Sequence, residues 1–256
     1  MTLRHLTLAL PLLLVLAACN KPAEDAPVAA APAATPAADA GTPAPDVAAD
    51  TATPADTAPA APAQLDAKAN LVPGTDYAVI EGGQPLQPLD GKVEVVEVFA
   101  YWCGHCAAFE PSLKAWKAKL PADVRFTPIP LGGGAADTLA RVYYAAETTG
   151  QLGKVHDAMF AAIHHERALQ PNAGQDQILA YLGKKGVDVQ ALGAAMSSFA
   201  MGARLSQGMQ FAQRSGVEGT PTLIVNGKYR ILGRSQDEQL QIANALIARE
   251  RAASGG

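Results

Sequence analysis

The residues best suited to chemistry are two cysteines separated by two residues, Cys103 and Cys106, in the sequence Tyr-Trp-Cys-Gly-His-Cys. They follow an apolar run at 93–100 that predicts a buried strand, and helical spacing begins directly after them. A thiol at the start of a helix faces unpaired N–H groups and the positive end of the helix dipole, which both favour the thiolate. The second thiol lies one turn along the helix, within reach of a disulfide. The pair therefore predicts a redox dithiol.

The number of cysteines narrows the alternatives. The chain has three, Cys19, Cys103 and Cys106. A structural zinc site normally needs four ligands, and the sequence contains no second Cys-x-x-Cys pair. A zinc site completed by histidines and a purely structural disulfide stay as alternatives, but the strand-to-helix junction favours the redox interpretation.

The first 19 residues have the layout of an export signal. Arg4 and His5 give a basic start, and residues 6–18 form an apolar stretch too short for a dependable membrane span. The segment ends in Leu-Ala-Ala-Cys19, which resembles the bacterial lipoprotein cleavage box, and the resemblance implies that Cys19 is lipidated. The alternative is an ordinary secretory signal peptide with an incidental cysteine. Both predict export into a compartment that permits disulfides.

Residues 20–66 consist almost entirely of Ala, Pro, Thr and Asp, with no aromatic residue and no hydrophobic period. Such a segment cannot bury enough surface to offset its ordering entropy, so it predicts a disordered tether. Residues 67–256 have the size of a single domain. The net charge of −4 is small and no basic cluster is present, which argues against a nucleic-acid partner.

Hydrophobic periods and turn residues predict an α/β domain. Strands are expected at 77–80, 93–100, 124–129, 222–226 and 228–232. Helices are expected at 103–120, 138–148, 152–164, 175–185, 189–213 and 235–249. Pro128 places its strand near an edge or a strand end, and Asn226-Gly227 predicts a hairpin turn. This order describes a sheet interrupted by a helical insertion at about 135–214.

The early strand–Cys-x-x-Cys–helix, combined with a late Gly219-Thr-Pro-Thr222, resembles the thioredoxin superfamily and, more narrowly, the DsbA family of periplasmic thiol:disulfide oxidoreductases. The resemblance covers about residues 75–250. It implies a thioredoxin-like fold with a central mixed β-sheet and a helical insertion. It also implies an enzyme that introduces disulfide bonds into exported proteins and needs no bound cofactor.

The resemblance assigns roles to the residues of the motif. It makes Cys103 the nucleophile, Cys106 its resolving partner, and Gly104 with His105 the dipeptide that tunes the redox properties. Many family members have Pro at the position of Gly104, whereas Cys-Gly-His-Cys is the motif of eukaryotic protein disulfide isomerases. The direction of the reaction therefore stays open between an oxidase and an isomerase or reductase.

Three further residues are assigned in the same way. Thr220 and Pro221 match a cis-proline pair that packs against the disulfide and offers backbone to a bound peptide. Glu97 lies six residues before Cys103 and matches a buried carboxylate with a raised pKa that shuttles a proton. The alternative for Glu97 is an exposed residue on an edge strand.

The resemblance also implies partners. These are exported client proteins with free thiols and a quinone-linked, DsbB-like membrane protein that reoxidises the dithiol. The chain is expected to act as a monomer in the periplasm, tethered to a membrane by its N-terminal lipid. A metal-binding, copper-chaperone-like lipoprotein that uses the same cysteines is the alternative from another functional class.

The remaining distinctive residues are expected to be structural. His156, His164 and His165 lie in the predicted helical insertion and are interpreted as solvated side chains rather than metal ligands. Phe199 and Met209 are expected to fill the core or a groove.

Overall fold

The computed structural model describes residues 66–133 and 137–254, which all belong to one compact unit. The predicted signal segment, Cys19 and almost all of the predicted tether lie outside the described residues. Within the described part of the chain, no helix is both long enough and apolar enough to cross a membrane.

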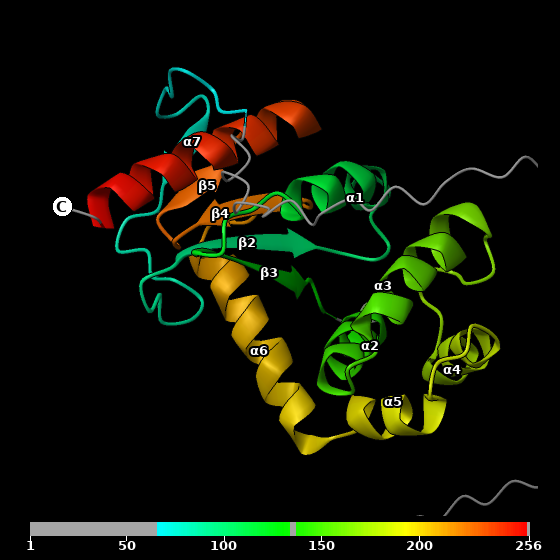
Figure 1. The fold of residues 1–256 in the computed structure, drawn as a ribbon. Helices are drawn as coiled ribbons and strands as arrows, with labels where there is room; N and C mark the ends of the chain where they lie inside the picture. The colour runs from blue at the N-terminus through cyan, green and yellow to red at the C-terminus, as the bar shows by residue number, and fades with distance from the viewer. Residues whose placement is uncertain (1–65, 134–136, 255–256) are drawn as a thin grey trace, which may run out of the picture. The chain divides into compact units, whose positions relative to one another are not determined.

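The centre of this unit is a five-stranded mixed sheet, as the sequence predicted, with the strand order β1-β5-β4-β2-β3 (Figure 1). β2 pairs in parallel with β3, and every other pairing is antiparallel. The strands are β1 (Tyr77–Val79), β2 (Val93–Phe99), β3 (Val124–Pro130), β4 (Thr222–Val225) and β5 (Tyr229–Ile231).

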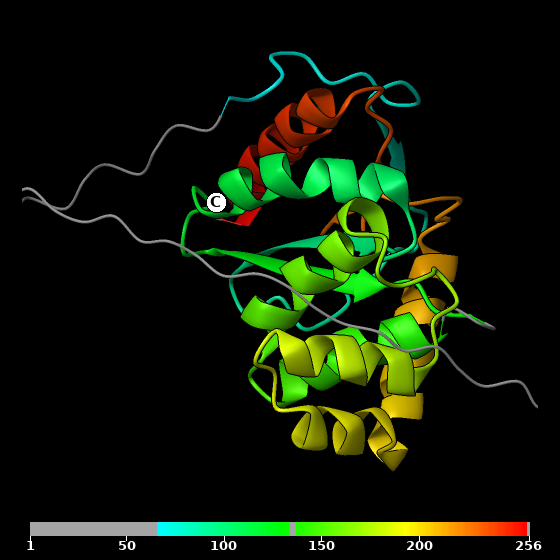
Figure 2. The same ribbon diagram turned by 90° about the vertical axis from the view of Figure 1, so that its right-hand side faces the viewer.

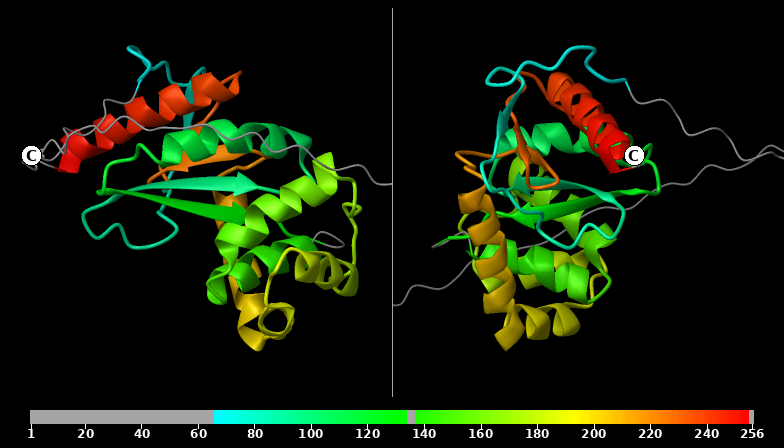
Figure 3. Two further views of the ribbon diagram at one scale, coloured as in Figure 1. Left: turned by 45° about the vertical axis from the view of Figure 1, so that its right-hand side comes forward. Right: turned by 90° about the vertical axis from the view of Figure 1, so that its left-hand side faces the viewer.

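β2 is buried along its whole length because both faces of the sheet are covered. On one face, Val95 belongs to a core shared with α1 (Gly104–Lys117) and α7 (Gln236–Ser254). On the other face, Val96 packs in a cluster with Phe211. Figures 1 and 3 show α1 and α7 together on one side of the sheet and α6 on the other. This coverage explains the unbroken apolar run before the cysteines.

Two turn and edge predictions are confirmed. Pro128 lies in β3 at the edge of the sheet, where a missing N–H removes no ladder bond on the open side. β4 and β5 form a hairpin in which Asn226 and Gly227 both have positive φ, 51° and 65°. A Cβ on Gly227 would lie 2.0 Å from the backbone oxygen of Gln84, so only glycine fits there.

Between β3 and β4 the chain is helical, which confirms the predicted insertion; Figure 2 shows its helices stacked beside the sheet. Its elements are α2 (Asp137–Thr148), α3 (Leu152–Phe160), the π-helical turn η2 (Ala161–His165), α4 (Gln175–Lys184), α5 (Val189–Met196) and α6 (Phe199–Arg214).

The single helix predicted over 189–213 is wrong, because the chain breaks between α5 and α6. Ser198 has extended backbone, with ψ at 150°, and serine side chains favour helix ends over helix interiors. On a continuous helix, Met196 and Met201 would point about 140° apart. The break allows both of these side chains to be buried.

The prediction that Phe199 lies in the core is also wrong. Phe199 is the first residue of α6 and its side chain is fully exposed, and Met209 on the same helix is 38% exposed. The change of direction at the break turns the start of α6 outward, which periodicity along one helix cannot reveal.

Candidate active site

Cys103 occupies the N-cap position of α1. Its backbone is extended, and the preceding turn is closed by the Cys103 N–H donating to the Ala100 carbonyl oxygen at 3.0 Å. The Cys106 N–H in the first turn of the helix lies 3.4 Å from Cys103 Sγ, which accepts this bond. The sulfur thus takes the place of the side-chain oxygen of an ordinary N-cap residue. It also faces the positive end of the helix dipole.

A segment far along the chain completes the surroundings of Cys103. In the thiol form, Cys103 Sγ donates to the Thr220 carbonyl oxygen at 3.2 Å. The Thr220–Pro221 peptide bond is cis, as the resemblance implied, and β4 begins directly after it. The antiparallel pairing of β2 with β4 therefore brings this pair to the end of the sheet where the cysteines lie.

Both thiols are free, but the pKa of Cys103 is lowered and the pKa of Cys106 is raised. For Cys103, burial raises the pKa. Hydrogen bonds from the Thr220 side chain and from backbone N–H groups of Cys106 and His105 outweigh this effect, so the pKa is lowered overall. For Cys106, which is 1% exposed, burial raises the pKa far above its ordinary value. Of the two thiols, Cys103 is therefore the one that forms a nucleophilic thiolate more readily.

The two residues between the cysteines are exposed. A Cβ on Gly104 would meet no atom within 4 Å, so the backbone here would admit a larger residue. The carbonyl oxygen of His105 accepts a bond from Gln236 Nε2 on α7, at 3.4 Å. His105 influences the dithiol through its backbone N–H, which helps to lower the pKa of Cys103.

Glu97 is buried in β2 with 3% of its surface exposed, so the alternative of an exposed edge residue is wrong. Burial raises its pKa to about 8, and the negative charges of Glu110 and Cys103 add to the shift while Lys117 opposes it. The carboxyl group is therefore mostly protonated at neutral pH. A group with such a pKa can both give and take a proton in that range.

The turn at residues 100–103, which leads into α1 and presents Cys103, is here called the redox turn. The sequence interpretation missed that His156 and His164 contact Tyr101 in this turn. His156 Nδ1 lies 2.9 Å from the Tyr101 hydroxyl, and His164 Nε2 lies 2.7 Å from the Tyr101 carbonyl oxygen. The prediction that both are solvated is wrong, whereas His165 is exposed as expected. One signal was available, because both histidines lie four residues from Phe160 and so share its buried face.

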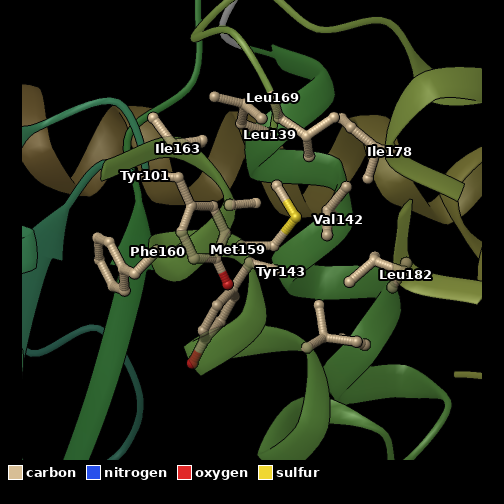
Figure 4. Packing of buried hydrophobic residues seen from close by; sticks show 14 of the residues in the cluster. Tyr101, Leu139, Val142, Tyr143, Met159, Phe160, Ile163, Leu169, Ile178 and Leu182 are labelled. Carbon is tan, nitrogen blue, oxygen red and sulfur yellow. The ribbon is translucent and has the colours of Figure 1, made fainter. Parts of the chain in front are cut away.

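The cysteines and the insertion share one apolar core. The cluster that contains Cys103 and Cys106 also contains Tyr101, Met159 and Phe160. Figure 4 shows Tyr101 among side chains from the insertion helices. The insertion therefore packs directly behind the turn that carries the dithiol. Across residues 66–133 and 137–254, no group of three or more His, Cys, Asp or Glu side chains is arranged to hold a metal ion.

Comparisons with known proteins agree with this geometry. The chain is 39% identical over 186 residues to the thiol:disulfide interchange protein DsbA of Pseudomonas aeruginosa strain PAO1, covering 71% of this chain and 86% of that protein. It is 36% identical over 185 residues to the protein of the same name from Pseudomonas syringae pv. tomato, covering 71% of this chain and 85% of that protein.

Solved structures of DsbA proteins also match this chain. The crystal structure of oxidoreductase DsbA from Xylella fastidiosa matches with a TM-score of 0.68 and 39% identity, covering 71% of this chain and 98% of that one. The oxidoreductase NmDsbA1 from Neisseria meningitidis matches with a TM-score of 0.65 and 27% identity, covering 75% of this chain and 100% of that one. The profile of the DSBA-like thioredoxin domain matches residues 94–245, which include the cysteines, the insertion and the cis-proline pair. The chain therefore belongs to the DSBA-like thioredoxin domain family.

Proposed function

We propose that this chain is a thiol:disulfide oxidoreductase that introduces disulfide bonds into exported proteins by dithiol–disulfide exchange. The observation that carries the proposal is the placement of the two thiols. Cys103 Sγ caps the start of α1 and its pKa is lowered, whereas Cys106 is buried one turn along and its pKa is raised. Such a pair has one reactive sulfur and one buried resolving sulfur. The names of the DsbA relatives, which are thiol:disulfide interchange proteins, support the same reaction.

The reaction begins with the Cys103–Cys106 disulfide. A client thiolate attacks Cys103 Sγ, a bond forms between the client sulfur and Cys103, and the bond to Cys106 breaks. A second client thiolate then attacks the client sulfur of this mixed disulfide, which forms the client disulfide and releases the Cys103 thiolate. Two electrons pass from the client to the cysteine pair.

The acidity of Cys103 favours the oxidase direction. A thiolate that is stabilised in the reduced protein leaves readily from the mixed disulfide and makes the disulfide form more oxidising. Gly104 and His105 lie where they tune this balance, since the His105 N–H contributes to the lowered pKa. An isomerase or reductase would use the same thiols in the other direction and is the second candidate.

Glu97 is proposed to carry the proton of the first step. The Cys106 sulfur has a high pKa, so it leaves the disulfide readily only if it receives a proton. Glu97, with a pKa of about 8 and a charge interaction with Cys103, is protonated at neutral pH and can supply one. A pocket lined by Glu110, Lys117 and Pro128 lies on the side of Glu97 where Pro128 is paired with it in the sheet, and proton exchange with solvent is proposed to take place on this side.

Thr220 and Pro221 are proposed to bind the client. They lie beside Cys103 at the start of β4, where an extended client segment can pair with backbone next to the reactive sulfur. Trp102, directly before the nucleophile, is 41% exposed and gives this surface an apolar component.

The location and partners belong to the same proposal. The protein acts in the periplasm as a monomer, anchored through a lipid on Cys19 and separated from the membrane by the segment 20–66. A DsbB-like, quinone-linked membrane protein reoxidises the dithiol.

The proposed lipid anchor can be tested by substitution. Cys19→Ala should release the chain into the soluble periplasmic fraction with its exchange activity intact. A wild-type chain that is already soluble, with an unmodified N-terminus, would show that no anchor exists.

The exchange reaction is tested with a reduced, unfolded client protein that has one native disulfide. The oxidised chain should restore the client disulfide, and Cys103→Ser should be inactive. Reduced Cys106→Ser, mixed with the client in its disulfide form, should accumulate a mixed disulfide, because Cys103 attacks the client disulfide and no Cys106 thiol is left to resolve the complex. Alkylation of the reduced chain at mildly acidic pH should label Cys103 far faster than Cys106. Equal labelling rates, or a trapped complex on Cys106, would overturn the assigned roles.

A further inference from the structure

The insertion contacts the redox turn through a π-helical segment. We propose that His164, in the π-helical turn η2, is a positioning residue of the redox centre, because its imidazole holds the Tyr101 carbonyl and so fixes the turn that presents Cys103. The inference rests on the proposed exchange reaction at Cys103, and it names a residue that holds Cys103 in position for that reaction.

The hydrogen bond is well defined. His164 Nε2 lies 2.7 Å from the Tyr101 carbonyl oxygen, and a carbonyl oxygen only accepts, so Nε2 carries the proton of this bond. Tyr101 is 1% exposed, so its carbonyl group has little access to water. The turn itself is closed by the neighbouring carbonyl of Ala100, which accepts from the Cys103 N–H. His164 thus supplies the Tyr101 carbonyl with a donor from another part of the fold.

The π-turn explains how His164 reaches this position. The Glu166 N–H bonds to the Ala161 carbonyl oxygen at 2.8 Å, one residue further back than in an α-helix. The Ala162 carbonyl, which an α-helix would have used there, instead accepts from Leu169 at 3.2 Å. Such π-helical turns are rare and often occur at functional sites.

The Tyr101 side chain is held by the same insertion. Its hydroxyl lies 2.9 Å from His156 Nδ1, and His156 Nε2 lies 3.4 Å from a Glu110 carboxylate oxygen. The Tyr101 ring packs edge-on against Phe99. It also packs edge-on against Phe160, which lies beside it in Figure 4. With the ring fixed, loss of the His164 bond leaves a buried carbonyl without its donor. The peptide after Tyr101 would then rotate toward water and displace Cys103 from its capping geometry.

The decisive experiment compares His164→Gln with His164→Met, which have similar size and shape but differ in whether they can donate to the carbonyl. His164→Ala is a second variant without a donor, so the comparison needs only one of the two to fold. His165→Ala is the matched control, since His165 is the exposed neighbour in the same turn. The readouts are the ultraviolet titration of the Cys103 thiolate and the redox equilibrium of the purified chain with glutathione.

In the variants without a donor, the Cys103 thiolate should become less stable, and the equilibrium with glutathione should shift about 3- to 10-fold toward the disulfide form. His164→Gln and His165→Ala should stay within about twofold of the wild type, which is well below the value of one lost hydrogen bond to a buried group. Equal thiolate titrations and equilibria for the Gln and Met variants would overturn the inference, whatever their unfolding transitions. The titration requires no client, so it tests His164 even if the wild-type chain fails to oxidise client proteins.

Discussion

At the scale of single residues, the pKa values of the active-site groups are controlled mainly by burial and by hydrogen bonds from backbone N–H groups. Cys103 and Cys106 are three residues apart, yet only Cys103 has enough donors around its sulfur to overcome the cost of burying a charge. Glu97 has the opposite balance, because neighbouring negative charges add to the effect of burial.

The Thr220 hydroxyl can be tested through the acidity of Cys103. Thr220→Val removes a hydrogen bond that lowers the pKa of Cys103, so this pKa should rise and the disulfide should become less oxidising. Thiolate titration and equilibration with glutathione measure both effects. Thr222→Val is the control, since the Thr222 hydroxyl donates to the Gly219 carbonyl oxygen instead. Unchanged titration in Thr220→Val would show that the backbone N–H groups suffice.

Glu97 should make stability depend on pH. Its pKa is raised from 4.5 to about 8 in the folded chain, so the unfolded chain loses this proton first as the pH rises. The folded state is therefore destabilised progressively between these two values. Glu97→Gln, which cannot ionise, should gain stability relative to the wild type as the pH rises from below 4.5 to above 8, by on the order of 5 kcal/mol.

The measurement is chemical denaturation at pH below 4.5 and above 8, with Glu218→Gln at an exposed position as the control. The advantage of Glu97→Gln should grow with pH. It should also be larger in the reduced chain, where the Cys103 charge adds to the shift. An advantage that is constant over the whole range would mean that the pKa of Glu97 is the same in the folded and the unfolded chain.

At the scale of elements, α6 packs closely against α2 and β3, and a glycine makes this close approach possible. Gly208 is buried where α6 crosses the sheet, and a Cβ there would lie 2.7 Å from the Tyr144 hydroxyl and 2.9 Å from Ile129 Cγ2. Gly202 lies earlier on the same helix, and a Cβ there would meet no atom within 4 Å.

These two glycines give a matched test of the packing of α6. Gly208→Ala should lose about 1–3 kcal/mol of unfolding free energy, because the added methyl group overpacks the interface. Gly202→Ala should gain about 0.5–1 kcal/mol from helix propensity alone. Both values come from denaturant unfolding. A Gly208→Ala chain as stable as Gly202→Ala would show that α6 can move away from Tyr144 without cost.

At the scale of the whole described unit, Asn244 joins three segments that are distant in sequence. Its side-chain oxygen accepts from Trp116 Nε1 of α1 at 2.6 Å, and its side-chain nitrogen donates to the Asp66 carbonyl oxygen at 2.6 Å. A backbone bond from Lys68 to the Gln241 carbonyl oxygen lies alongside. The start of the described chain is thereby attached to α7 and, through it, to the helix that carries the dithiol.

Asn244→Leu keeps the volume but leaves the buried Trp116 N–H without its acceptor, so it should cost about 1–3 kcal/mol of unfolding free energy. Gln241→Ala is the control on the same helix, since Gln241 is exposed and contributes its backbone carbonyl, and it should change stability by less than about 0.5 kcal/mol. Denaturant unfolding measures both. The thiolate titration of Cys103 should be unchanged in each, because neither residue contacts the redox turn.

The sequence alone determined the features that depend on local order along the chain. These features are a strand followed at once by Cys103 and a helix, an Asn226-Gly227 turn, and a proline at the start of β4, and a short segment indicates each of them by itself. The order of the elements along the chain, including the helical insertion, followed from these segments, and the structure confirms it.

Only the tertiary structure decided the properties that arise between distant segments. The pKa of Glu97 depends on what covers β2, and the roles of His156 and His164 depend on the insertion folding back onto Tyr101. The break before Phe199 followed from burying residues on both sides of it, against a helical period that continues across it in the sequence. Burial and contact between remote residues are properties of the packed chain, so no local pattern could report them.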